Sequence, residues 1–132
     1  NIHWLGPKPY AELPAYLGHW DMGWMPFALN EATRYISPTK TPEFLAAGLP
    51  VVSTAIVDVV RTYGAQGLVQ IADADDIEEK IREALGNPKD LLRNTVDAYL
   101  ATMSWDQTWS SMTAHLTRAA RPRADQALRV GA

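Results

Sequence analysis

The stretch SPTKTPEFLAAGLPVVST, from Ser37 to Thr54, joins the end of a loop to a short helix and then to a strand. Ser37 or Thr39 is expected to cap a helix over residues 42–47, because both side chains offer an oxygen to free backbone N–H groups. Gly48 is placed to end that helix, since glycine readily adopts the left-handed conformation found after helix ends. The β-branched residues that follow predict a buried strand.

The same alternation of strand and helix runs along most of the chain. The expected strands cover residues 2–5, 21–25, 51–53 and 67–71, and the expected helices cover 10–20, 57–63, 77–85, 91–103 and 105–116. Short apolar strands separated by helices predict an α/β fold with a mainly parallel, Rossmann-like sheet of about four strands, covered on both faces. Its last third is expected to be helical.

Composition limits the class of protein. The 132 residues suit one domain, which we expect over residues 1–120, with a flexible tail at 121–132. A net charge of -3 gives no electrostatic reason to expect nucleic acid as a partner. There is no cysteine, no signal-peptide pattern and no apolar run long enough to span a membrane. We expect a soluble cytoplasmic domain, and a start at Asn1 suggests a piece of a longer protein.

The sequence offers little support for a metal site or a catalytic nucleophile. The three histidines, His3, His19 and His115, share no ligand spacing, so no metal site is expected. The acidic run 73–76 precedes an apolar helical pattern, and Asp75 or Asp76 is expected to cap that helix. No motif of a catalytic serine or of a dinucleotide-binding glycine loop is present, so no catalytic residue is assigned.

Lys40 and Glu43 stand out at the start of the helix in the opening stretch. Free N–H groups at a helix start attract anions, and Lys40 adds a positive charge beside them. A carboxylate one turn later suits a ligand whose phosphate is attached to a neutral group with hydroxyls, such as ribose. The alternative is that the two side chains form only a solvated ion pair.

Residues 39–54, TKTPEFLAAGLPVVST, together with IHWLG, DMGWMPF and GLVQIADADDIEEKI, resemble the donor-binding, carboxyl-terminal domain of retaining glycosyltransferases with the GT-B fold. The resemblance covers about residues 1–120. It implies that Glu43 holds the ribose hydroxyls and that backbone N–H groups of residues 37–40 receive the diphosphate. It also implies that the loop from Gly6 to Lys8 lies against the nucleobase.

The candidate nucleotide-sugar-binding residues are therefore Gly6, Lys8, Ser37, Thr39, Lys40 and Glu43. The chain departs from the family at Tyr35, where many members have a second glutamate near the donor sugar. Glu31, in the preceding loop, is a candidate substitute for it.

The resemblance implies a glycosyltransferase that uses a nucleotide sugar, with uridine diphosphate as the expected carrier, and that needs no cofactor or metal. Two central strands and the acceptor-binding domain of that fold have no counterpart here. The expected consequences are that the chain alone does not catalyse transfer and that unpaired strand edges promote self-association. The saccharide or lipid acceptor would bind the absent domain, with the full enzyme at the inner face of a membrane. The alternatives are a nucleotide-sugar epimerase of the same architecture, a phospho-receiver domain and an interaction module.

Overall fold

The computed structural model describes residues 1–88 and 91–120. Its sheet has three parallel strands in the order β1-β2-β3. They are β1 (Gly23–Met25), β2 (Val51–Thr54) and β3 (Gln70–Ala72). Gly23 pairs with Val51, and Val52 pairs with Gln70. The described part of the chain is therefore an α/β structure, as predicted.

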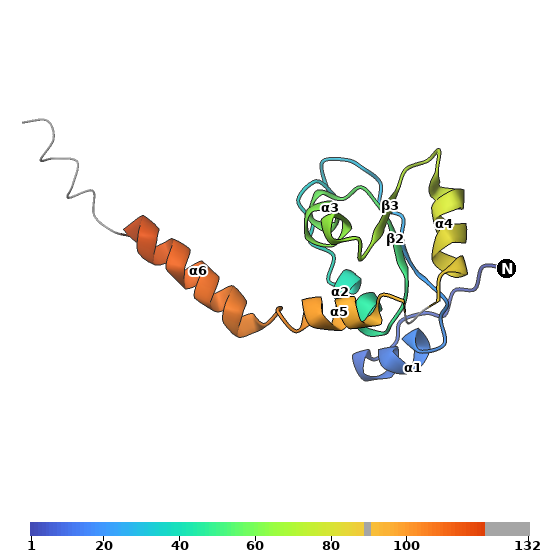
Figure 1. Ribbon diagram of the computed structural model, residues 1–132, viewed down its shortest axis with the longest axis horizontal. Helices are drawn as coiled ribbons and strands as arrows, with labels where there is room; N and C mark the ends of the chain where they lie inside the picture. The colour runs from blue at the N-terminus through green and yellow to red at the C-terminus, as the bar shows by residue number, and fades with distance from the viewer. Residues whose placement is uncertain (89–90, 121–132) are drawn as a thin grey trace, which may run out of the picture. The chain divides into compact units, whose positions relative to one another are not determined.

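Helices separate the strands along the described chain, and three α-helices follow the last strand (Figure 1). The short 3-10 helices are η1 (Tyr10–Glu12) and η2 (Gly64–Gln66). The α-helices are α1 (Leu13–Leu17), α2 (Lys40–Ala46), α3 (Val57–Thr62), α4 (Ile77–Gly86), α5 (Arg93–Leu100) and α6 (Trp105–Ala120). Each helix expected from the apolar spacing is present, although the first one splits into η1 and α1.

Strand β2 is buried on both of its faces. Val52 and Ala72 pack with Ala84 of α4, and α4 lies beside β2 and β3 in Figure 1. Val51 belongs to the larger core cluster, which includes residues of α2, α3 and α5. Successive side chains of a strand point to opposite faces, so helices on both sides of the sheet explain the uninterrupted apolar sequence of β2.

The prediction of a strand at residues 2–5, and with it the count of about four strands, is wrong for the described residues. Residues 2–5 have no strand structure, and Ile2 and Trp4 are 96% and 91% exposed. A strand is stable only with a hydrogen-bonded neighbour, and among the described residues β1, at the edge of the sheet, pairs with β2 alone. The apolar character of Ile2, Trp4 and Leu5 is therefore not sufficient to make this segment a strand.

The described residues 101–120 belong to a second compact unit, whose helix is α6. An apolar stripe at helical spacing lies on this helix, and its side chains are exposed in this unit: Trp105, Trp109, Met112 and Leu116. Within its own unit, α6 has no buried residue. The predicted flexible tail at 121–132 lies outside the described residues.

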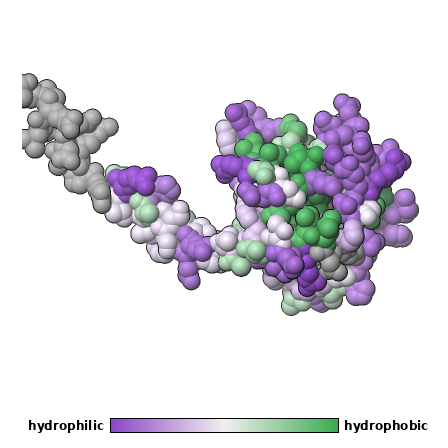
Figure 2. Space-filling model, in the orientation of Figure 1, coloured by the Kyte–Doolittle hydropathy of each residue, from purple (hydrophilic) through white to green (hydrophobic). Residues whose placement is uncertain are grey.

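The surface of the first unit, residues 1–100, also carries apolar side chains, which Figure 2 shows in green among polar ones. Trp24 of β1 is 47% exposed, and Val57 of α3 is 58% exposed. Within the described residues, no helix combines the length and the apolar character that crossing a bilayer requires.

Candidate functional site

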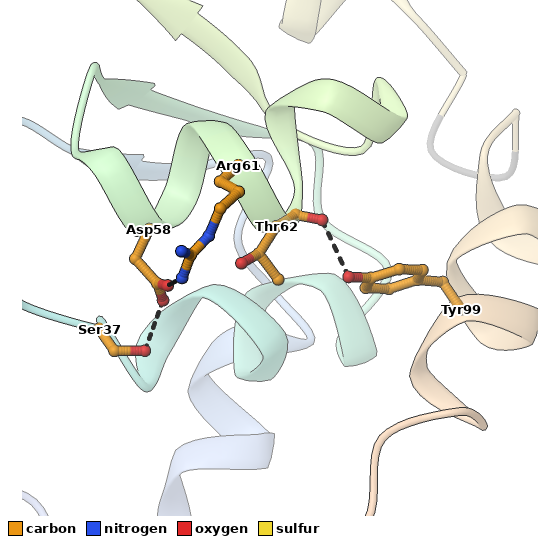
Figure 3. Close-up of polar contacts among 5 residues, drawn as sticks. All are labelled: Ser37, Asp58, Arg61, Thr62 and Tyr99. Carbon is orange, nitrogen blue, oxygen red and sulfur yellow. Dashed lines mark hydrogen bonds and ion pairs between the residues drawn. The ribbon is translucent and has the colours of Figure 1, made fainter. Parts of the chain in front are cut away.

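Hydrogen bonds hold the loop between β1 and α2 at both ends, one from the last residue of β2 and one to the first turn of α3. At its start, the Thr54 hydroxyl donates a 2.8 Å hydrogen bond to the carbonyl of Phe27. At its end, the Ser37 hydroxyl donates a 2.6 Å hydrogen bond to the Asp58 carboxylate in the first turn of α3 (Figure 3). The loop therefore lies along the carboxyl ends of the parallel strands, where open α/β sheets bind their ligands.

Asp58 links the loop before α2 to α3, a contact that no sequence pattern indicated. Besides accepting from Ser37, it pairs with Arg61 at 3.0 Å, and its side chain is 26% exposed (Figure 3). Nearby, the Tyr99 hydroxyl of α5 donates a 2.9 Å bond to the carbonyl of Thr62 at the end of α3. In the sequence, Asp58 was marked only by its position in the first turn of a helix, where an acid usually stabilises that helix through its dipole.

The prediction that Ser37 or Thr39 caps α2 is wrong. Neither Ser37 nor Thr39 makes a side-chain hydrogen bond that caps the helix, and the Ser37 hydroxyl is used by Asp58 instead. Thr39 stands immediately before the helix with helical backbone angles, whereas typical capping residues are extended. The backbone N–H groups of Ser37, Thr39 and Lys40 consequently have no acceptor among the described residues.

Lys40 and Glu43 do not pair with each other in the structure. Lys40 is exposed and has no hydrogen-bond or ion-pair partner among the residues described. Glu43 accepts a 3.2 Å hydrogen bond from the hydroxyl of Tyr10, in η1. This hydrogen bond, together with the carboxylate charge, raises the pKa of Tyr10 above its ordinary value of 10.0. Within the described part, the two side chains on the first turn of α2 therefore have separate roles.

Gly6 and Lys8 lie at the start of the N-terminal segment. Gly6 has a φ of 71°, a left-handed conformation that favours glycine. The Lys8 ammonium lies over the ring of Tyr16, 5.4 Å from its centre. Within the described residues, no hydrogen bond or ion pair joins Gly6 or Lys8 to residues 37–43. Tyr10, which the sequence did not single out, makes a side-chain hydrogen bond to α2 through Glu43.

Two hollows are lined by candidate residues of the sequence analysis, Glu43 in one and Glu31 in the other. One, of about 300 Å³, lies between α1 and α2 and is lined in part by Tyr10 and Glu43. The other, of about 320 Å³, lies between the loop after β1 and the β2–α3 turn. Glu31 and Arg34 line the second hollow, so the predicted substitute acid is at the carboxyl ends of the strands. Tyr35 is 84% exposed and stacks under the Arg34 guanidinium at 5.3 Å.

A third hollow, of about 210 Å³, lies near the amino ends of β2 and β3 and is mainly apolar. Gln70 lines it, and the Gln70 side-chain oxygen is buried without a partner among the described residues. Ligands of open α/β sheets bind at the opposite, carboxyl ends of the strands, which favours the second hollow. The first hollow is a candidate because Glu43 lines it.

The acidic run 73–76 forms a turn before α4. The Asp73 carboxylate accepts from the backbone N–H groups of Asp75 and Asp76, at 2.8 and 3.2 Å. The Asp76 carboxylate accepts from the N–H of Asp73 at 2.8 Å, and it does not cap α4 by a side-chain bond as expected. No group of three or more metal-ligating side chains is present in the described residues.

Comparison with known proteins gives one informative match. Part of the chain is 43% identical over 54 residues to the "Putative teichuronic acid biosynthesis glycosyltransferase TuaH" of Bacillus subtilis (strain 168). The matched stretch is 41% of this chain and 14% of that protein. No family model matches the chain, and no solved structure matches it. The match supports a relationship to glycosyltransferases.

Proposed function

We propose that this chain is the donor-binding portion of a glycosyltransferase that transfers a sugar from a nucleoside diphosphate to a saccharide or lipid acceptor. The observation that carries the proposal is the 43% identity to a protein described as a glycosyltransferase. The resemblance of residues 1–120 to the carboxyl-terminal domain of GT-B enzymes supports the finer assignment. The parallel sheet flanked by helices is compatible with that fold.

In this proposal, the turn from Ser37 to Lys40 receives the diphosphate. Its three unused N–H groups and the unpaired Lys40 ammonium offer positive charge without competing partners in the described residues. The bond between the sugar and the diphosphate breaks during transfer, and negative charge grows on the leaving diphosphate. Fixed hydrogen-bond donors that stabilise this charge lower the barrier, which is electrostatic catalysis and needs no metal.

Glu43 is the proposed ribose contact. One of its oxygens accepts from Tyr10, and an ionised carboxylate has further acceptor sites for the two ribose hydroxyls. Gly6 and Lys8 are the proposed neighbours of the nucleobase, for which uracil is the expected identity. The acceptor would bind a domain outside this chain, in an enzyme of the cytoplasm or of the inner face of a membrane.

Binding of uridine diphosphate tests the proposal. A ¹⁵N-labelled sample of the chain is titrated with uridine diphosphate, guanosine diphosphate and adenosine diphosphate while the amide signals are followed. We expect uridine diphosphate to shift the signals of residues 37–43 at lower concentrations than the other two nucleotides. If the chain binds none of the three, and the full-length enzyme also binds none, the proposed function is wrong.

A further inference from the structure

Tyr10 joins the N-terminal segment to the proposed ribose contact. Its hydroxyl donates a 3.2 Å hydrogen bond to Oε1 of Glu43, a residue 33 positions away in the sequence. The second carboxylate oxygen, Oε2, has no hydrogen-bond partner among the described residues. Because an ionised carboxylate has about four acceptor positions, Tyr10 leaves room for a diol on the same side chain.

The hollow beside this pair has room for a ring. It measures about 300 Å³. For comparison, an engineered cavity of about 150 Å³ binds benzene. Tyr10 and Glu43 supply all the polar side-chain groups of its lining, and the other lining residues are Leu13, Pro14, Leu17, Gly18, Ala46 and Ala47. A ligand ring in this hollow would therefore find hydrogen-bonding side chains only where Tyr10 meets Glu43.

We propose that Tyr10 is a positioning residue, which holds the Glu43 carboxylate at the rim of this hollow for the ribose hydroxyls of a nucleoside diphosphate. The inference rests on the proposed function. A glutamate side chain has several rotatable bonds, and fixing it before the ligand arrives reduces the entropy lost on binding. Tyr10 is 74% exposed and competes with water for this role, so a modest effect is expected.

The opposite role would be competition, in which Tyr10 occupies Glu43 and must leave before the ribose binds. The two roles differ in sign. Removing the Tyr10 hydroxyl weakens recognition of the 2′-hydroxyl if Tyr10 positions Glu43, and strengthens it if Tyr10 competes.

The test compares Tyr10→Phe with Tyr16→Phe, a matched control in the same segment. The Tyr16 hydroxyl has no hydrogen-bond partner among the described residues, and its ring lies under Lys8. Calorimetry gives Kd for uridine diphosphate and for its 2′-deoxy analogue with each variant. The Kd of the 2′-deoxy analogue divided by the Kd of uridine diphosphate measures ribose preference. Tyr10→Phe should reduce this ratio by about 2- to 3-fold, the lower end of the range for one hydrogen bond, because Tyr10 is exposed. Tyr16→Phe should leave it unchanged.

A second variant separates positioning from general damage to the fold. In a Glu43→Ala background, Tyr10→Phe should cause no further change in the ratio, because the carboxylate that Tyr10 positions is gone. An unchanged or increased ratio in Tyr10→Phe alone overturns the inference while the donor-binding function stands. Equal Kd values of the wild type for the two nucleotides also overturn the inference and leave the donor-binding function standing. Failure of the wild type to bind uridine diphosphate overturns both.

Discussion

At the scale of single residues, the first turn of α2 carries one charge that is engaged and one that is free. Glu43 is held by Tyr10, whereas Lys40 has no partner among the described residues. An exposed lysine without an ion pair contributes little to folding stability. Its removal should therefore change ligand binding with little effect on the fold.

Lys40→Ala should weaken binding of uridine diphosphate more than binding of uridine. The expected loss for the diphosphate is about 1–3 kcal/mol, as for a hydrogen bond to a charged group. Calorimetric titration of both ligands measures the difference. The matched control is Lys80→Ala, because Lys80 lies on α4 and pairs with Glu83 at 3.0 Å. Equal losses for the two ligands would show that Lys40 does not contact the phosphates.

The residues that could be predicted from the sequence are those whose role is local. Gly48 was expected after α2 and has the left-handed φ of 74° that this position requires. Tyr10 and Asp58 could not be predicted, because their partners are 33 and 21 positions away. Spacing within one helix or strand carries no information about such contacts.

At the scale of elements, the position of α2 depends on close packing against β1. Gly23 of β1 is buried, and a Cβ atom there would lie 2.8 Å from Cγ of Phe44 in α2. Phe44 is only 8% exposed and is in edge contact with Trp20 at 6.0 Å, so its ring has little space to move. The position of α2, and of the candidate residues on its first turn, therefore depends on the lack of a side chain at Gly23.

Gly23→Ala should lower the free energy of unfolding by about 1–3 kcal/mol, the usual cost of overpacking a core. Urea denaturation followed by circular dichroism measures the change. Gly86→Ala is the matched control, because nothing lies within 4 Å of a Cβ at the end of α4. If both variants are equally stable, the packing of Phe44 on β1 is looser than described.

The hydrogen bond between Ser37 and Asp58 should fix the loop before α2 to α3. In a double-mutant cycle with Ser37→Ala and Asp58→Ala, we expect a coupling of about 0.5–3 kcal/mol in the free energy of unfolding. Arg61→Ala is the control, since it removes the Asp58 ion pair but leaves the bond from Ser37. Additive effects of the two substitutions would mean that the loop is not held by this bond.

At the scale of the whole molecule, the sheet of the described residues has two edges, β1 and β3. Alternating strands and helices were enough to predict a parallel sheet, because each unit is defined by local pattern. They were not enough to predict the number of strands, since pairing depends on which neighbour is present. Trp24 is next to Val52 in register, yet it is 47% exposed because α4 packs on β2 and β3.

An open edge with an exposed tryptophan should favour association between copies of the chain. We expect sedimentation velocity to show a species larger than the monomer as concentration rises. Trp24→Lys should reduce it, because a charge on an edge strand opposes pairing. Trp109→Lys, on α6, is the comparison. If only Trp109→Lys reduces association, the contact involves α6 and not the edge of β1.

Recognition of ribose by Glu43 can be measured directly by comparing two nucleotides. Binding of uridine diphosphate and of its 2′-deoxy analogue is measured with the wild type and with Glu43→Ala. Because the substitution and the missing hydroxyl remove parts of one interaction, their costs should not add, with a coupling of about 0.5–3 kcal/mol. Glu43→Gln, which keeps one acceptor oxygen, should retain part of the preference. Equal binding of both nucleotides by the wild type, or a coupling of zero within error, would contradict the account.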